Sequence, residues 1–101
     1  MLTEAALTGL REHFMNRVAY AQYTVNEREE TAKIESASIL ADGRVSISLI
    51  IAAALDRSEI VTEVRLYDAN DVLLAQKPET VTREMAQDGI YYRFFFRIEE
   101  V

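Results

Sequence analysis

The chain has 101 residues, half of them hydrophobic and 28% charged, with no cysteine and a formal net charge of -6. This composition is typical of a folded globular protein, and the length fits a single domain over residues 1–101. The negative charge repels phosphate backbones and anionic membranes, so we expect neither nucleic acid nor a membrane as a partner. Without cysteine the chain can have no disulfide, thiolate nucleophile or sulfur-ligated metal.

The first residues do not combine a basic segment with an apolar one, so we expect no secretory signal peptide. The longest apolar run, Leu49–Leu55, is much shorter than the roughly 20 residues that a membrane-spanning helix needs. We therefore expect neither export by the ordinary route nor insertion into a membrane.

Apolar residues recur at steps of three and four over about residues 3–21, which predicts an amphipathic helix packed on a sheet. Thr3 is a suitable N-cap, with Glu4 in the first turn. The alternatives for this helix are a membrane surface or a partner protein, but its polar face is mixed in sign rather than basic. The face expected to meet the sheet consists of Leu7, Leu10, Phe14, Val18 and Ala21.

From about residue 22 the period shortens toward two, which predicts an antiparallel β-rich part over residues 22–101. A short strand at 22–26 is followed by a charged turn at 27–30. The next strand, 31–40, changes parity near residues 36–38, which indicates a bulge. Asp42-Gly43 then predicts a hairpin with a type I′ turn.

Three more strands complete the expected sheet of about six strands. The first, 45–54, has one apolar face, formed by Val45, Ile47, Leu49, Ile51 and Ala53. Its other face becomes apolar near Ile50, which predicts that both faces are covered there. A hairpin at 59–75 follows, with Ile60, Val64 and Leu66 expected on one face, and Pro78 is expected to end it because proline cannot donate to a strand ladder. A helical turn from Thr82 is expected in the polar link 80–89.

The final strand, 90–99, places Tyr92 and Phe94 on an inward face that we expect to pack against Leu10 and Phe14. Truncating Phe14 or Phe94 to alanine should then cost roughly 3 to 5 kcal/mol. The complete expectation is an α+β fold, an N-terminal amphipathic helix packed on an antiparallel β-sheet or β-sandwich.

A search for reactive groups finds no catalytic, cofactor-binding or metal-binding constellation, and we expect no enzyme. The single histidine, His13, lies within the helix without a thiol or second imidazole, so a solvated side chain or a pH switch is expected there. Asp68, Asn70 and Asp71 resemble a calcium loop, but the required glycine and distal glutamate are missing, which favours a hairpin turn. Acidic runs near Glu30 and at the C-terminus are expected to be solvated.

The second face of the last strand is the candidate interface. Tyr, Phe and Arg are the residue types enriched at protein interfaces. The alternatives are a subunit contact and coverage by a second sheet layer of the same chain, and both stay open. The candidate residues are Tyr91, Arg93, Phe95, Arg97 and, from the preceding hairpin, Tyr67.

Two segments resemble known proteins. Ile60–Ala69 followed by Val72–Ala75 resembles the segment I-T-E-(I/V)-x-L-Y-D-A-(D/N)-G-x-L-(I/L)-A of bacteriophage and prophage tail proteins, which include tail fibre and baseplate modules. Leu2–Leu10 leading into Tyr20–Asn26 looks like the start of small tail-associated proteins. Together these segments cover about a third of the chain. This chain has Asp71 where the family usually has the turn glycine.

The resemblance implies a non-enzymatic structural or adaptor subunit of a tail assembly. Its implied partners are other tail proteins and itself, as a homo-oligomer, without a cofactor. Its implied location is the virion tail, or the bacterial cytoplasm during assembly. The alternative is a small-ligand binding or enzymatic domain with a cystatin-like, helix-wrapped sheet, for which an apolar cavity with converging polar groups would be expected.

Overall fold

The computed structural model describes residues 1–54, 57–84 and 89–100, in which one helix precedes six strands. The antiparallel pairing of all neighbouring strands confirms the expected α+β fold. The elements are α1 (Glu4–Arg17), β1 (Tyr20–Val25), β2 (Arg28–Ile39), β3 (Val45–Ile51), β4 (Glu59–Tyr67), β5 (Leu73–Arg83) and β6 (Ile90–Phe96).

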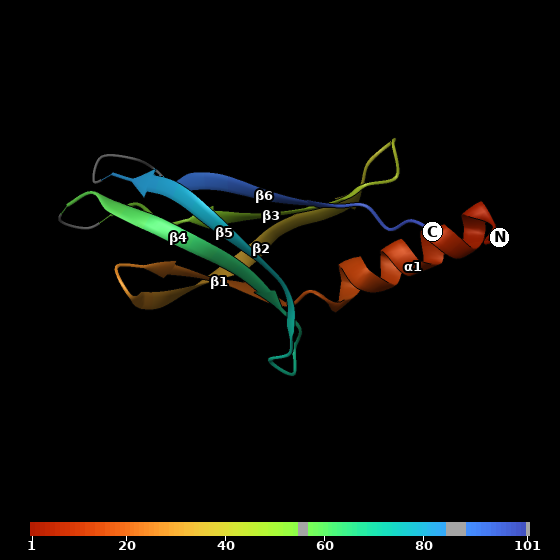
Figure 1. Cartoon of the computed structure of the whole chain (residues 1–101), viewed down its shortest axis with the longest axis horizontal. Helices are drawn as coiled ribbons and strands as arrows, with labels where there is room; N and C mark the ends of the chain where they lie inside the picture. The colour runs from red at the N-terminus through yellow and green to blue at the C-terminus, as the bar shows by residue number, and fades with distance from the viewer. Residues whose placement is uncertain (55–56, 85–88, 101) are drawn as a thin grey trace.

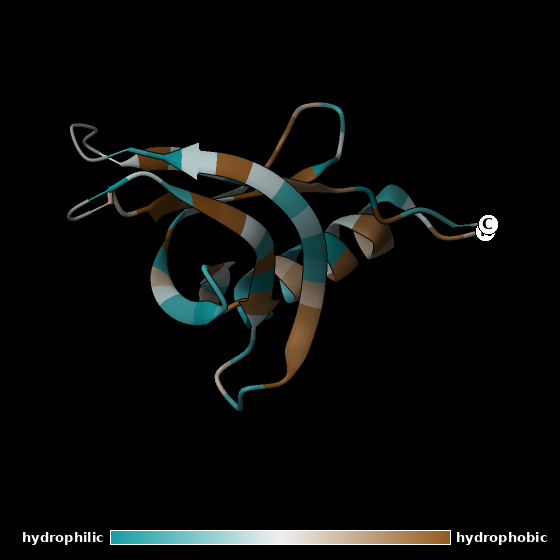
Figure 2. Ribbon diagram, turned by 60° about the vertical axis from the view of Figure 1, so that its left-hand side comes forward, coloured by the Kyte–Doolittle hydropathy of each residue, from teal (hydrophilic) through white to brown (hydrophobic). Residues whose placement is uncertain are grey.

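The strands form one sheet in the order β5-β4-β1-β2-β3-β6, which curls toward a barrel (Figure 2). Its two edge strands, β5 and β6, are joined by a side-chain hydrogen bond in which the Tyr92 hydroxyl donates to Glu79 Oε2 at 2.7 Å. One curled sheet therefore exists in place of the two layers of a sandwich. As a result, the outer face of β6 has no second layer over it among the described residues.

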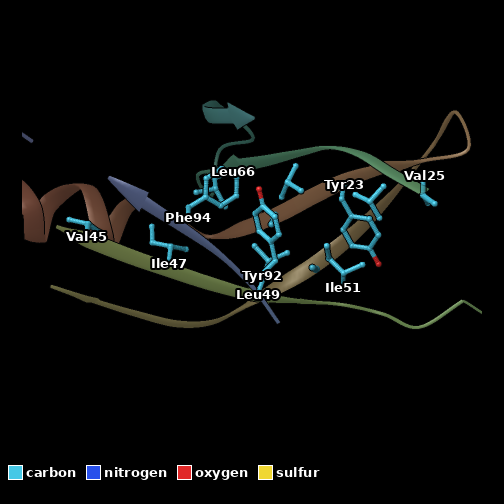
Figure 3. Packing of buried hydrophobic residues seen from close by; sticks show 13 residues of the cluster. Tyr23, Val25, Val45, Ile47, Leu49, Ile51, Leu66, Tyr92 and Phe94 are labelled. Atoms are coloured by element: carbon cyan, nitrogen blue, oxygen red, sulfur yellow. The ribbon is translucent and has the colours of Figure 1, made fainter. Parts of the chain in front are cut away.

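The interior of the barrel is filled by alternate residues of the strands (Figure 3). The expected inward face of β3 is confirmed, because Ile47, Leu49 and Ile51 are completely buried. In β1 the buried set begins at Ala21, so this residue belongs to the strand rather than to the helix. Tyr92 and Phe94 of β6 are also buried, and their neighbours on the strand point outward.

The helix is shorter than expected and only its C-terminal part contacts the barrel. Thr3 is the N-cap, since its hydroxyl accepts a hydrogen bond from the Ala6 N–H at 3.2 Å. No residue of α1 is fully buried, and Leu10 is 48% exposed, so its expected place in the core is wrong. Phe14 does pack, with its ring 4.9 Å from that of Phe96. Figure 1 shows the remainder of α1 projecting beyond the sheet, where the Leu2 N–H donates to Glu100 Oε1 at 2.7 Å.

The hairpin at Asp42-Gly43 is present, but its turn is not of type I′. Only Gly43 has a positive φ there, +88°, and the Gly43 N–H donates to the Leu40 carbonyl. This is the three-residue loop in which a type I turn is followed by a left-handed residue. The two consecutive positive φ angles of a type I′ turn occur instead between β1 and β2, at Asn26 and Glu27.

The hairpin between β4 and β5 has the same three-residue loop, with Asp71 as its left-handed residue at φ +62°. Asp68, which is buried, organises this loop by accepting the N–H groups of Asn70 and Val72 at 2.9 Å each. These hydrogen bonds lower the pKa of Asp68, and the bond from the Val72 N–H has the largest effect. Arg17 also donates to Asp68 Oδ2, so the turn holds the end of α1.

Three expectations for β3, β4 and β5 are wrong. Ile60 is 47% exposed, since a register shift between Val61 and Glu63 reverses the parity of β4. Pro78 does not end the hairpin, because β5 is an edge strand in which a missing N–H is tolerated. Ile50 is 44% exposed and therefore not covered on the outer face.

Two further expectations concern irregular segments. The bulge expected in β2 near residues 36–38 lies slightly earlier, at the register shift between Ile34 and Ser36. Thr82 belongs to β5, so no helix begins there. The rest of the expected helical turn, up to Met85, lies outside the described residues.

Phe94→Ala should destabilise the protein by roughly 3 to 5 kcal/mol, because Phe94 is 5% exposed and its loss leaves a cavity between Tyr92 and Phe96. Phe14→Ala should cost less, because Phe14 is only partly buried. Urea unfolding of both variants measures this difference. Equal losses, or wild-type stability for Phe94→Ala, would show that the core is assigned wrongly.

Glu27→Gly should stabilise the protein by about 0.5 to 1 kcal/mol, because glycine adopts the φ of +64° at this position without the steric penalty of a Cβ. The matched control is Lys33→Gly, at an exposed position inside β2, which should destabilise the protein. Thermal unfolding of the two variants measures both effects. A melting temperature lowered by Glu27→Gly would contradict the turn assignment.

Candidate functional site

Three residues of β6 and one of β3 form an exposed row on the outer face of the sheet, which we call the aromatic stripe: Ile50, Tyr91, Arg93 and Phe95. Tyr91 is 51% and Phe95 46% exposed. Ile50 lies directly opposite Tyr91 in the β3–β6 pairing. About half of each of these apolar side chains is therefore surface that the described chain does not cover.

Arginine side chains hold the rings of the aromatic stripe in place. The guanidinium of Arg93 lies over the Tyr91 ring at 5.2 Å from its centroid, and that of Arg44 lies over Phe95 at 4.7 Å. The Tyr91 hydroxyl donates to Ser48 Oγ at 2.9 Å. Hydrogen bonds to Ser36 and Ser48 lower the pKa of Tyr91. The stripe is therefore an ordered surface of alternating rings and positive charges.

Of the other two candidate interface residues, Arg97 lies just beyond the end of this row and Tyr67 lies on a different part of the sheet. Arg97 follows β6 directly and is exposed, with its Nε 3.4 Å from Glu99 Oε1. Tyr67 lies on β4, which is separated from β3 by β1 and β2. Its ring stacks on that of Tyr20 at 5.2 Å between centroids. Tyr67 is thus placed away from the aromatic stripe.

A second cluster lies inside the barrel, at the end away from α1 (Figure 1), and was not predicted from the sequence. We call it the charged mouth, and its central residues are Glu30, Glu59 and Arg83. Arg83, with a side chain only 3% exposed, lies between two carboxylates. Its Nη2 donates to Glu30 Oε2 at 2.6 Å and to Glu59 Oε1 at 2.7 Å. Its Nη1 also donates to the Ala52 carbonyl at 3.2 Å. The residue therefore joins β5 to β2, to β4 and to the segment after β3.

The remaining oxygens of the charged mouth have partners as well. Arg28 donates to both carboxylate oxygens of Glu59, and Asn26 donates to Glu59 Oε2 at 2.8 Å. The Tyr23 hydroxyl donates to Glu30 Oε1 at 3.0 Å. Each carboxylate thus accepts hydrogen bonds from several donors, most of them charged.

These bonds determine the ionisation of the charged mouth. The guanidinium of Arg83 lowers the pKa of Glu30, and Arg83 followed by Arg28 lowers the pKa of Glu59. A general acid and base need pKa values that are pushed apart. Here both values are pushed down, so both carboxylates are ionised at neutral pH and neither can donate a proton. The arrangement is that of a structural ion-pair network.

The charged mouth opens into a depression of about 530 Å³. Arg57 lies on its wall. The inward parity of Glu30 could have been recognised in the sequence, because it is the parity of Ala32 and Ile34. The contact with Arg83 could not, because 53 residues separate the two in the chain. The described lining is Arg28, Glu30, Ala52, Ala53, Arg57, Glu59 and Arg83.

No other cluster with evident chemistry is present in the part of the chain that the structure describes. His13 is exposed on α1. Within the described ranges, no three histidine, aspartate or glutamate side chains are grouped as metal ligands. No described helix is long and apolar enough to cross a membrane. Comparisons with protein-family models, with curated proteins and with solved structures found no match to this chain.

Arg83→Met should destabilise the protein by about 3 kcal/mol or more at pH 7, because it leaves the buried Glu59 and the partly buried Glu30 without their main partner. In the wild type the lowered carboxyl pKa values stabilise the fold above the ordinary glutamate pKa, and this stabilisation is lost as the pH falls. The variant lacks that contribution. The stability difference between the two proteins should therefore narrow between about pH 5 and pH 2.

Urea unfolding across this pH range measures the effect. The control is Arg44→Met, which removes an exposed pair with Asp42 and a surface contact with the Phe95 ring, and should change stability much less than Arg83→Met at any pH. A loss from Arg83→Met that does not change with pH would contradict the assigned ionisation.

Proposed function

We propose that this chain is a non-enzymatic structural or adaptor subunit that acts through protein–protein contacts of the aromatic stripe. The exposure of Tyr91, Phe95 and Ile50 in one ordered row is the observation that carries the proposal. Tyrosine, phenylalanine and arginine are enriched at interfaces, where rigid rings lose little conformational entropy on binding. Because Arg44 and Arg93 already hold the rings, little ordering remains to be done when a partner docks.

The setting that we propose is a bacteriophage or prophage tail assembly, with other tail proteins and a second copy of this chain as partners. The support is the resemblance of the β4–β5 hairpin to segments of tail proteins. In that segment the family usually has glycine where this chain has Asp71. The positive φ of Asp71 is an angle that glycine adopts readily, so the turn geometry is compatible with the family pattern.

The structure favours assembly over the small-ligand alternative. A cystatin-like binding or enzymatic domain would be expected to have an apolar cavity on which polar groups converge. The interior described here is instead packed with side chains such as Ile47, Leu49 and Leu66, which are completely buried. In the charged mouth the carboxylates are already paired with arginines. The exposed aromatic stripe, by contrast, still has apolar area to bury.

Phe95→Glu should reduce the oligomer size of the purified protein without unfolding it, because Phe95 is half exposed and a charge there must be desolvated in a contact. Light scattering measures the size, and circular dichroism checks the fold. The matched control is Val72→Glu, at a 46% exposed apolar residue in the β4–β5 turn, which should leave the oligomer unchanged. Equal effects of the two variants would contradict a role for the stripe.

A strictly monomeric wild type at high concentration would exclude the contact between copies but not docking to another tail protein. Co-purification with the products of neighbouring genes tests that contact. A gene neighbourhood without tail-length, baseplate or fibre genes would contradict the tail setting.

A further inference from the structure

We infer that β6 pairs edge to edge with β6 of a second copy, antiparallel, about a two-fold axis at Phe94. The inference rests on the proposed function, because it specifies how the strand that carries the aromatic stripe makes its contact. The two sheets would continue into one another through backbone hydrogen bonds, as in other complexes that extend a sheet at its edge. A symmetric dimer of this kind uses the same surface on both copies.

The two edges of the sheet differ in how well they are protected from such pairing. Natural edge strands are protected by proline, lysine and bulges. β5 has Lys77 and Pro78 near its middle and two register shifts against β4. β6 has neither residue, and it pairs with β3 without interruption from Ile51↔Ile90 to Val45↔Phe96. The outer edge of β6 is therefore regular and rich in aromatic residues, and it lacks the proline, lysine and bulges that protect β5.

The alternation of side chains limits the registers that are possible. Residues that lie directly opposite in an antiparallel pair must point to the same side of the sheet. Two copies of β6 can thus be related only by a two-fold axis at a residue, and not by an axis between residues. Near the middle of β6 the possible centres are Tyr92, Arg93 and Phe94.

Charge decides among these centres. An axis at Arg93 gives the longest overlap but places this arginine opposite its own copy, and like charges directly opposite are destabilising. An axis at Phe94 places Arg93 opposite Phe95 and Tyr91 opposite Arg97, each twice by symmetry. These are arginine–aromatic pairs, the same kind of contact that Arg93 and Tyr91 make within one chain at 5.2 Å. An axis at Tyr92 gives only the pair of Tyr91 with Arg93.

The position of β5 also favours the axis at Phe94. At Tyr92, β6 is tied to β5 by the hydrogen bond to Glu79. Toward the helix end of the molecule the two strands diverge (Figure 1). An incoming strand centred on Phe94 therefore has its middle on the open side of the gap, and only its end, where Phe96 lies opposite Tyr92, reaches the hydrogen bond to Glu79. A strand centred on Tyr92 would have its middle at Glu79.

Cysteine cross-linking tests this register in the full chain, which has no cysteine of its own. Arg93→Cys and Phe95→Cys proteins are mixed in equal amounts, oxidised gently and separated on a non-reducing gel. The mixture should form cross-linked dimers roughly tenfold faster than either variant alone, because only directly opposite residues approach closely enough for a disulfide. Tyr91→Cys mixed with Arg97→Cys should behave in the same way.

The matched control is Gln76→Cys, at an exposed position on the protected edge strand β5, which should not cross-link with Phe95→Cys. Fastest cross-linking of Arg93→Cys with itself would overturn the register and leave the proposed function intact. If no pair cross-links while Phe95→Glu still reduces oligomer size, the copies meet through their faces and the edge pairing is wrong. A strictly monomeric protein would also overturn it.

Discussion

One guanidinium group holds the charged mouth of the barrel together. The backbone of β5 pairs with β4, yet the side chain of Arg83 at its end reaches Glu30 on β2 and the Ala52 carbonyl after β3. Buried carboxylates and guanidinium groups are costly unless all of them find partners. The sheet must therefore curl far enough to bring these strand ends together. The ion-pair network and the curvature of the sheet depend on each other.

Because the sheet is curved, it has an interior face and an outer face that differ in composition. Inside the barrel, apolar side chains fill one end and the charged mouth occupies the other. Outside, β3 and β6 form a regular surface on which Ser46 and Ser48 are covered while Ile50 and Phe95 remain exposed. In the pairing of β3 with β6, Ser46 lies opposite Phe95 and Ser48 opposite Arg93. The surface that we propose as an interface thus consists of covered serines as well as exposed rings.

Local patterns predicted the elements well, and long-range contacts account for most of the errors. Thr3 as N-cap and the inward row of Ile47, Leu49 and Ile51 depend on nearby residues alone, and both are confirmed. The register shift that exposes Ile60 depends on how β5 pairs with β4, which no local pattern contains. The hairpin of Asp42 was predicted, but its turn type depends on whether one or two residues take a positive φ. The proposed assembly role remains a prediction.

The hydrogen bond between Leu2 and Glu100 places the two ends of the described chain next to each other, at the helix end of the molecule (Figure 1). Nearly all of the sheet, including the charged mouth, lies away from these ends. A protein fused to either end would therefore lie at the same side of the molecule, next to α1. The whole chain has the geometry of a module that can be inserted between two residues of a host polypeptide without stretching either side of the junction.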